Sequence, residues 1–110
     1  MKDYRIFLRH IFESIEEIEK DIQGIDEVKF SQSTQIQDAV IRRLEIIGEA
    51  AKHIPEEIRN KYHLIPWKKV AGSRDVLIHK YFEIDLEAVW DTVVKDLPRL
   101  KQEIRPALAE

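Results

Sequence analysis

Apolar residues recur along much of this chain at intervals of three and four positions, with charged residues between them. In the first stretch they are Tyr4, Phe7, Leu8, Ile11, Ile15, Ile18 and Ile22. This spacing puts apolar side chains on one face of an α-helix. The pattern returns between residues 36 and 54 and between residues 86 and 104, whereas no segment alternates with the period of two that is typical of strands. The sequence therefore predicts an all-α fold without a sheet, built as an antiparallel up-and-down helical bundle.

Turn-forming and capping residues predict where the first two long helices begin and end. We expect the first helix to stop near Gly24 and "GIDEVKFSQS" to form a loop. Thr34 and Gln37 have the spacing of a capping box, so a second long helix is expected to begin at Thr34. Pro55 should end this helix, because the residue before a proline is disfavoured in the α conformation.

Prolines also mark the helices of the second half. "PEEIRNKY" is expected to form a short helix with Pro55 at its first position, and Pro66 should open a medium helix in the same way. Asp85 is a good N-cap for the last long helix, and Pro98 should kink that helix near Val94. The expected bundle therefore has three long helices, one medium helix and one short helix.

Length and composition narrow the class of protein. A chain of 110 residues suits one domain, residues 1–110. The absence of cysteine excludes disulfides and thiolate metal ligands and favours a reducing compartment. Since no apolar run is long enough to span a bilayer and no signal segment stands at the start, we expect a cytoplasmic protein with no membrane partner. The net charge of −3 gives no general attraction to nucleic acid, so phosphate binding would need a local basic patch.

The segment "SRDVLIHKY" places polar and charged residues on a helix that is expected to face the core. If one helix runs from Trp67 to Tyr81 at about 100° per residue, its apolar residues lie within about 60° of Arg74. Arg74 is then in the middle of the apolar stripe, with Asp75 and His79 on the neighbouring flank. A buried arginine stays charged and needs an anionic or hydrogen-bonding partner. That partner can be an internal acid, a bound phosphate or a second subunit.

Each of these residues also has a purely structural explanation. Arg74 can form an internal ion pair, and His79 can be a partly exposed residue hydrogen-bonded to Asp75. Tyr81 can be a core aromatic residue with its hydroxyl at the surface. The spacing alone leaves these alternatives open.

Other candidate sites are weaker. The histidines lack the spacing of metal ligands, so we expect neither a metal nor another cofactor. Arg43 projects into the apolar stripe of the second long helix, where an internal salt bridge or an anion shared with Arg74 would explain it. A local positive patch surrounds the motif. Its residues are Lys68, Lys69, Arg74 and Lys80.

"SRDVLIHKY" fits the pattern R-x4-H-x-Y, and through it the chain resembles the HepT-like toxins of the HEPN superfamily. The resemblance extends to "QDAVIRRLEIIGEAAKHIPEEIR" and to the "IPW" and "YFEIDLEAVW" that flank the motif. It implies an all-α homodimer whose two motifs face each other across the twofold axis. They would form a metal-independent ribonuclease site that leaves a 2′,3′-cyclic phosphate. It also implies a partner, an MntA-type minimal nucleotidyltransferase antitoxin that attaches AMP to the motif tyrosine.

Carried over to this sequence, the resemblance assigns a role to each motif residue. Arg74 would hold the scissile phosphate, His79 would move the proton, and Tyr81 would be the AMPylation site. The family often has asparagine or another polar residue directly after the arginine, where this chain has Asp75. An acid there would repel phosphate unless its carboxylate turns to orient His79. Histidine and arginine suit this chemistry, because RNA cleavage needs proton transfer near neutral pH and a cation for the developing phosphorane charge.

Three functions from different classes follow. The leading hypothesis is an endoribonuclease toxin of a type VII toxin–antitoxin system, with RNA as substrate. The alternative is a non-catalytic HEPN module that binds the nucleotidyltransferase, a nucleotide or RNA, and Asp75 favours it. The third is a helical dimerisation domain in which Arg74 is paired internally.

Overall fold

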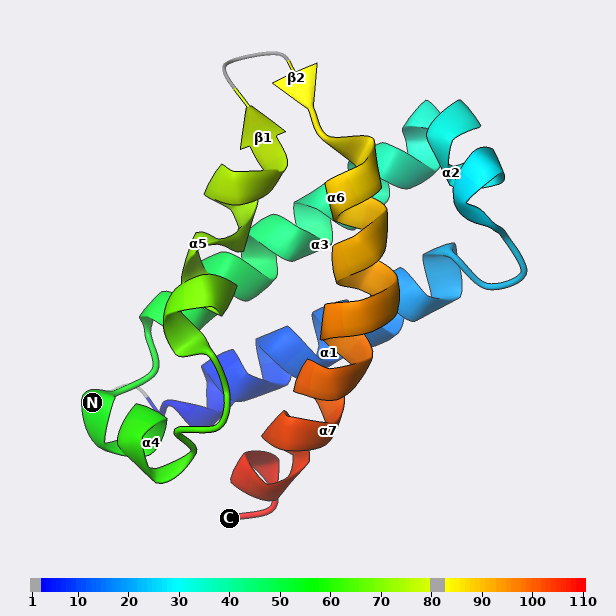
Figure 1. Ribbon diagram of the computed structural model, residues 1–110. Helices are drawn as coiled ribbons and strands as arrows, with labels where there is room; N and C mark the ends of the chain where they lie inside the picture. Colours follow the sequence, from blue (N-terminus) through cyan, green and yellow to red (C-terminus); the bar gives the residue numbers. More distant parts are fainter. Residues whose placement is uncertain (1–2, 80–82) are drawn as a thin grey trace.

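The computed structural model describes the backbone of residues 3–79 and 83–110 and the side chains of residues 3–72 and 85–110. Most of this backbone is helical, which confirms the predicted all-α class (Figure 1). The elements in chain order are α1 (Arg5–Asp21), α2 (Glu27–Gln32), α3 (Thr34–Lys52), α4 (Glu56–Lys61), α5 (Trp67–Leu77), β1 (Ile78–His79), β2 (Glu83–Ile84), α6 (Leu86–Asp91), the π-helical turn η1 (Thr92–Asp96) and α7 (Leu97–Leu108).

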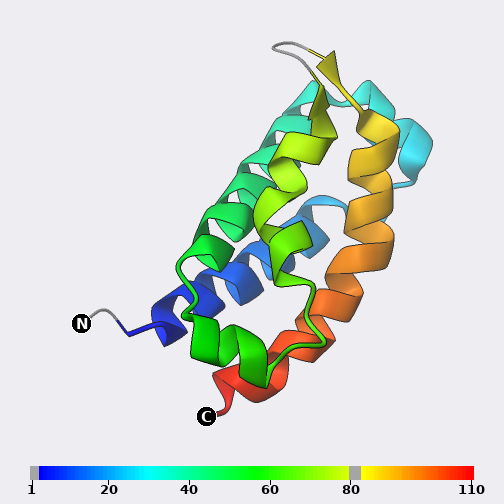
Figure 2. The ribbon, with the colours of Figure 1, turned by 60° about the vertical axis from the view of Figure 1, so that its left-hand side comes forward.

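The two longest helices, α1 and α3, run antiparallel and carry the centre of the core (Figures 1 and 2). The apolar spacing that predicted α1 is realised, because its repeating leucine and isoleucine side chains are fully buried. These are Leu8, Ile11, Ile15 and Ile18, each 0% exposed. They pack with Val40, Leu44 and Ile47 of α3 in one continuous apolar cluster. Burial of this face, more than intrinsic helix propensity, stabilises both helices.

The segment after α1 differs from the predicted loop. Gly24 lies in the turn after α1 and has a positive φ of 77°, as expected where a helix stops. Residues Glu27–Gln32 then form the short helix α2. The Asp26 side chain caps α2 by accepting a hydrogen bond from the Lys29 backbone N–H at 2.9 Å. Phe30 anchors it in the core, fully buried and 5.3 Å from the ring of Trp90. A cap and one buried aromatic residue therefore suffice to order six residues whose composition is typical of a loop.

The capping box predicted at Thr34 is also shifted by one residue. Ser33 is the N-cap of α3, and its hydroxyl accepts a hydrogen bond from the Ile36 backbone N–H at 3.2 Å. Gln37 does not close a box with Thr34. Its side-chain amide donates to the Phe30 carbonyl at 2.9 Å, which ties α3 to the end of α2. The predicted start of the helix was correct, but the residue that caps it was wrong.

Helix α4 and the start of α5 form the corner near both chain ends. Both helices begin one residue later than predicted: Pro55 is the N-cap of α4 rather than its first residue, and α5 begins at Trp67, directly after Pro66. The indole N–H of Trp67 donates to the Tyr62 carbonyl at 3.1 Å and fixes this corner. Nearby, Lys61 Nζ lies 2.6 Å from a Glu110 carboxylate oxygen, and this hydrogen bond raises the pKa of Lys61.

The chain ends meet at the same corner. The Arg5 guanidinium Nη1 donates to the backbone carbonyl of Glu110 at 3.3 Å. The start of α1 and the C-terminus therefore lie beside α4, at the end of the bundle away from β1 and β2 (Figures 1 and 2).

The last helical rod is made of α6, η1 and α7. Asp85 caps α6 as predicted, its carboxylate accepting from the Ala88 backbone N–H at 2.9 Å. The predicted irregularity near Val94 takes the form of η1, in which the Leu97 N–H bonds to the Thr92 carbonyl five residues earlier. Pro98 has no N–H to offer the carbonyl of Val94, and a π turn is a common response to such a gap. Within the described chain, no helix is both long and apolar enough to cross a bilayer.

Helix α5 lies against α3 and ends earlier than predicted. The two backbones approach closely at Gly48, where an added Cβ would lie only 3.2 Å from the Ala71 carbonyl oxygen. The predicted helix through Tyr81 is wrong, because α5 stops at Leu77 and Ile78–His79 pairs antiparallel with Glu83–Ile84. This is also the exception to the expectation of no sheet. The segment is rich in β-branched and aromatic residues, which favour extended backbone over helix.

Candidate functional site

The motif residues lie where α5 passes into the β1–β2 hairpin. The backbones of Arg74 and Asp75 belong to the last turns of α5, and His79 is the second residue of β1, opposite Glu83. Tyr81 lies outside the described residues, as do the side chains of Arg74, Asp75 and His79. The structure thus brings Arg74, Asp75 and His79 to one end of the bundle at the level of the backbone.

The end of α5 changes the geometry that was expected within the motif. On a continuous helix Arg74 and His79 would point about 140° apart and Tyr81 would return to within about 20° of Arg74. Those angles do not apply, since the helix ends at Leu77 and strand backbone follows. A strand rises about 3.3 Å per residue instead of 1.5 Å, so His79 is carried further from the helix end than a helical residue would be.

Two hollows flank α5, one on each side. Ala71 lines the first and Gly72 lines the second, so both hollows lie just before Arg74 along the chain. The helix that carries the motif is therefore at the rim of the bundle, with open space on either side.

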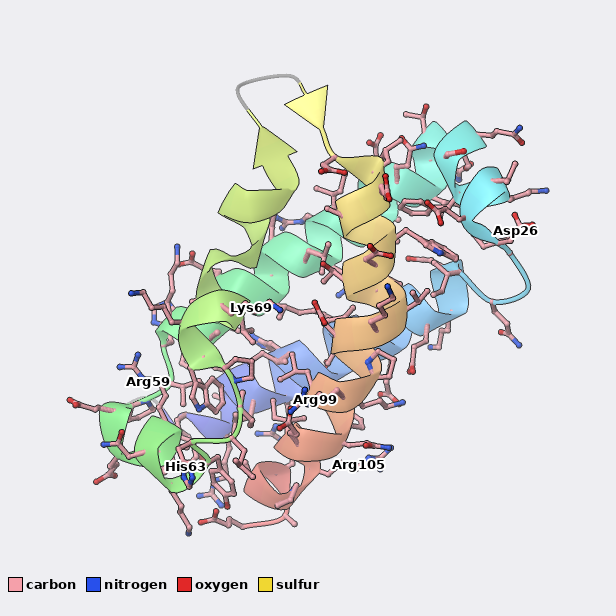
Figure 3. The ribbon with its side chains drawn as sticks, viewed as in Figure 1. Asp26, Arg59, His63, Lys69, Arg99 and Arg105 are labelled. Carbon is pink, nitrogen blue, oxygen red and sulfur yellow. The ribbon has the colours of Figure 1, made fainter. Side chains whose placement is uncertain are left out.

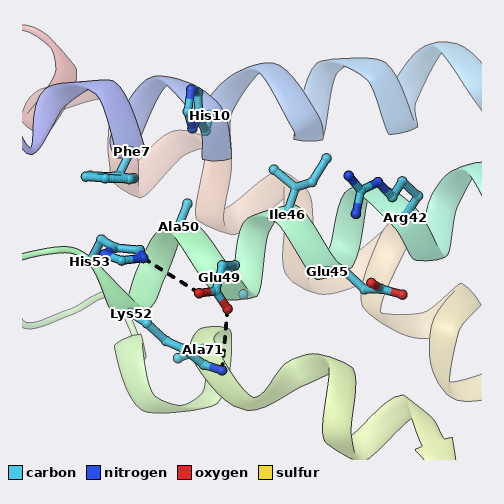
Figure 4. Close-up of a pocket in the computed structure, with 11 residues that line it drawn as sticks. Phe7, His10, Arg42, Glu45, Ile46, Glu49, Ala50, Lys52, His53 and Ala71 are labelled. Atoms are coloured by element: carbon cyan, nitrogen blue, oxygen red, sulfur yellow. Dashed lines mark ion pairs between the residues drawn. The ribbon is translucent and has the colours of Figure 1, made fainter.

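The first hollow, which we call the α3 groove, has a volume of about 490 Å³ and lies over α3 between α1 and α5 (Figure 4). Its lining is mostly polar and aromatic and includes Phe7, His10, Arg42, Glu49, His53 and Ala71. The Phe7 ring stacks on the His53 imidazole with centroids 4.7 Å apart and an interplanar angle of 16°. His10 approaches the same phenyl ring edge-on, with centroids 6.0 Å apart.

Charged side chains continue the α3 groove beside this stack. Glu49 Oε1 lies 3.6 Å from His53 Nε2, and Glu49 Oε2 lies 3.7 Å from Lys52 Nζ (Figure 4). All three side chains remain about half exposed or more, so these are solvated contacts that contribute little to stability. These side chains present a carboxylate, an ammonium group and an imidazole that a ligand in the groove could contact.

The second hollow, the α5–α7 groove, has a volume of about 420 Å³ and an apolar floor that includes Leu44 and Ile47. Lys69 reaches across it from α5 to Asp96 of η1, with Nζ 3.6 Å from the carboxylate (Figure 3). Arg99 of α7 also lines this groove. This groove has apolar side chains on its floor and charged side chains on its rim, a composition that is common in protein interfaces.

The structure describes the side chains of only some of the basic residues singled out in the sequence. Lys68 and Lys69 are exposed on α5, and Arg43 is half-buried on α3 as its position in the apolar stripe indicated. No acidic side chain in the described part of the chain forms an ion pair with Arg43. Among the residues described, no group of three or more histidine, aspartate or glutamate side chains is placed to hold a metal ion.

The contact of Phe7 with His53 was not predicted from the sequence. The two residues are 46 positions apart, and the sequence indicated only that the histidines lack metal-ligand spacing. They stack because α1 and α3 are antiparallel, and His10, one turn after Phe7 on α1, approaches the same phenyl ring edge-on. The apolar periodicity predicts which face of each helix is buried. It does not predict how the two helices are rotated against each other, and this rotation decides which side chains meet.

Comparison with known proteins identifies the family. A family model described as "Ribonuclease HepT-like" matches residues 11–107. The chain belongs to the HepT-like ribonuclease family. This confirms the resemblance read from the motif and its flanks, including the expected class of ribonuclease.

Several HepT-like relatives match nearly the whole chain. A protein of Thermococcus cleftensis named "Probable ribonuclease HepT" is 43% identical over 91% of this chain and 91% of its own length. One named "Putative RNase" from Caldanaerobacter subterraneus is 39% identical over 98% of this chain and 96% of its own.

A longer relative is also similar. A "Gamma-glutamylcyclotransferase and putative RNase" from Methanocaldococcus jannaschii is 53% identical over 99% of this chain. The chain spans about half of that protein, 49% of its length. No solved structure matches the chain significantly.

Proposed function

We propose that this protein is a metal-independent endoribonuclease in which Arg74 and His79 act at the interface of a homodimer. The observation that carries the proposal is the R-x4-H-x-Y segment, which begins in the last turns of α5, within a chain that belongs to the HepT-like family. The wider role we infer is that of a toxin in a type VII toxin–antitoxin system.

The proposed reaction is an internal transfer at phosphorus. A base takes the proton of the ribose 2′-OH, the 2′-oxygen bonds to phosphorus, and the bond from phosphorus to the 5′-oxygen breaks. The leaving oxygen takes up a proton, so the products are a 2′,3′-cyclic phosphate and a 5′-OH. The imidazole of His79 suits proton transfer, and the guanidinium of Arg74 suits the extra charge on the phosphoryl oxygens. Asp75 would orient His79.

A homodimer would supply the second set of groups that this chemistry needs. One histidine can act as base while its symmetry mate acts as acid, and two arginines can share one phosphate. The position of α5 at the rim of the bundle, beside the apolar floor of the α5–α7 groove, supports this arrangement. We expect a dimer by size-exclusion chromatography with light scattering at micromolar concentration, and a monomer would count heavily against it.

Cleavage of RNA by the purified protein tests the proposal directly. We expect the wild type to cut single-stranded RNA in the presence of EDTA and to leave cyclic-phosphate ends. His79→Ala should reduce the rate by about 100-fold or more, as expected for loss of a general acid–base group. His63→Ala, an exposed histidine of the corner after α4, is the matched control. Activity that disappears with chelator and returns with magnesium would overturn the metal-independent mechanism.

Regulation by AMPylation of Tyr81 is the second part of the proposal. AMP attached there would bring a negative phosphate and an adenosine beside the motif and would compete with RNA for Arg74. Co-expression with an MntA-type nucleotidyltransferase should add one or more AMP units to the wild type by intact-mass measurement. Tyr81→Phe should remain unmodified, whereas Tyr4→Phe should be modified normally. AMP on another residue would refute this assignment.

A non-catalytic module is the second candidate, and Asp75 is the residue that favours it. A carboxylate beside the phosphate site would weaken RNA cleavage by repulsion if it does not turn toward His79. Binding of the nucleotidyltransferase, nucleotide or RNA without cleavage, together with a gain of activity in Asp75→Asn, would support this alternative.

A further inference from the structure

The α3 groove has a feature that the proposed cleavage chemistry does not use. Phe7 and His53 form a parallel aromatic stack at its edge, with ring centroids 4.7 Å apart. Phe7 covers one face of the imidazole, yet the His53 side chain is still 49% exposed. The part of this ring that Phe7 does not cover is therefore accessible to a ligand, and Figure 4 shows the two stacked rings at the edge of the groove. An open aromatic face on a rigid support is a surface on which a planar ligand can stack.

The groups around the stack match those of a nucleotide. Glu49 presents two carboxylate oxygens beside the imidazole and is 67% exposed, so it can accept hydrogen bonds from a planar ligand. Lys52 and Arg42 are exposed cations along the same groove and can contact phosphate. Ordinary solvated pairs between neighbouring turns of α3 would explain the charges alone. They would not explain an open stacked ring in a hollow of about 490 Å³, which is large enough for a nucleobase.

The position of the α3 groove relative to the motif adds to this argument. Ala71 lines the groove, and Arg74 follows on the same helix three residues later, about 4.5 Å further along its axis. His53 lies at the end of the groove beside α4, beyond Ala71 from Arg74, so a strand of RNA with its scissile phosphate at Arg74 would reach the stack with a nucleotide further along the strand (Figure 4). Stacking and edge contacts to unpaired bases are the usual way in which proteins recognise single-stranded RNA.

We propose that the α3 groove is a nucleobase subsite for single-stranded RNA, in which a base further along the strand from the cleaved bond stacks on His53 and donates hydrogen bonds to Glu49. The inference rests on the proposed ribonuclease function and adds the class of substrate and its base preference. Guanine fits best, since it offers two adjacent N–H donors on its Watson–Crick edge to the two oxygens of one carboxylate. Lys52 and Arg42 contact the flanking phosphates, so they add affinity without base preference.

Binding and cleavage of short oligonucleotides test this subsite. The binding arm uses the His79→Ala protein and fluorescently labelled single-stranded RNAs that differ only by guanine, inosine or adenine at one position. We expect the guanine RNA to bind best and inosine, which lacks the exocyclic amino group, to bind more weakly. His53→Ala should weaken binding about 10-fold, the loss expected for one base–aromatic stack. His53→Phe keeps an aromatic face and should retain most of the affinity.

Glu49→Gln tests the edge contact separately. It should reduce the preference for guanine over adenine while leaving adenine binding nearly unchanged. His63→Ala and Glu57→Gln are matched controls on exposed positions outside the α3 groove, and both should bind like the parent protein. Thermal unfolding and elution volume should be the same for all variants.

The cleavage arm separates this inference from the proposed function. If the protein with His79 intact cuts RNA but His53→Ala and Glu49→Gln cut the same RNAs at unchanged rates, the subsite is wrong and the ribonuclease stands. If no RNA is cut, but His53→Ala still weakens binding, the ribonuclease proposal fails and the subsite survives. A changed elution volume in His53→Ala, with unchanged RNA affinity, would show instead that the groove is a contact between subunits.

Discussion

The two interfaces of α3 differ in how they are built. Toward α1, the helix faces leucine and isoleucine side chains that are fully buried over nearly the whole length of α1. Toward α5, the helix has a glycine, Gly48, which lets the Ala71 backbone come close to the backbone of α3. The described side chains that α5 buries are Trp67 at 7% and Val70 at 9% exposure, both in its first half. The interface of α3 with α1 consists of buried apolar side chains. The described interface of α3 with α5 brings the two helix backbones close together at Gly48.

This difference indicates a division of labour within α3. The contact with α1 supplies most of the stability, because buried apolar area is the main favourable term in folding. The described contact with α5 is a close approach of backbones, and it positions the helix that leads into Arg74 and His79. Substitutions at the first interface should therefore change stability most, and those further along α5 should change activity most.

The largest effect on stability is expected at the α1 interface. Ile15→Ala should lower the free energy of unfolding by about 2–5 kcal/mol, because it leaves a cavity among fully buried neighbours. Urea unfolding followed by circular dichroism measures this. Glu13→Ala, on an exposed position of the same helix, should change the free energy by less than about 0.5 kcal/mol. A similar small change for Ile15→Ala would remove the basis of the comparison.

An intermediate effect is expected where α3 meets α5. Gly48→Val should cost about 1–3 kcal/mol, since a side chain there meets the Ala71 carbonyl and pushes α5 away. We also expect slower RNA cleavage, because the motif moves with α5. Gly72→Ala is the control: no described atom lies within 4 Å of its added Cβ, so the substitution should stabilise by about 0.5–1 kcal/mol. Equal effects of the two substitutions would contradict the close-approach interpretation.

The smallest effect on stability, with the greatest effect on activity, is expected at Arg74. Arg74→Ala should abolish RNA cleavage while changing the free energy of unfolding by less than about 0.5 kcal/mol, since its charge serves the substrate more than the core. Cleavage assays and urea unfolding on the same preparation measure both quantities. A loss of several kcal/mol would mean that Arg74 is paired internally, as one of the structural alternatives holds.

The sequence predicted the long helices because their signals are local. The spacing in α1, the Asp85 cap and the irregularity before Pro98 each follow from residues within one or two turns. It missed α2, whose stability depends on Phe30 reaching the core beside Trp90, sixty residues later in the chain. It also extended α5 through Tyr81, because apolar residues at Leu77 and Ile78 fit a helical stripe as well as a strand.

The candidate site was predictable only in part. The motif residues were found from their pattern and from the family resemblance, and the family itself is confirmed. The α3 groove was not predicted, because it depends on Phe7 of α1 meeting His53 at the end of α3, a contact between residues far apart in the sequence. The homodimer, the roles of Arg74, Asp75, His79 and Tyr81, and the antitoxin partner stay predictions.

The contact of Arg5 with the Glu110 carbonyl has a practical consequence for building variants. With the C-terminus at the corner beside α4, a tag, dye or second domain joined to it would extend from the end of the bundle opposite the hairpin (Figures 1 and 2). Such an addition would leave the end of α5 that carries the motif accessible. The same proximity suits a circular permutant, in which a short linker joins the ends and the chain is opened at an exposed loop such as the one around Gly24. Immobilised through its C-terminus, the protein would present the motif outward.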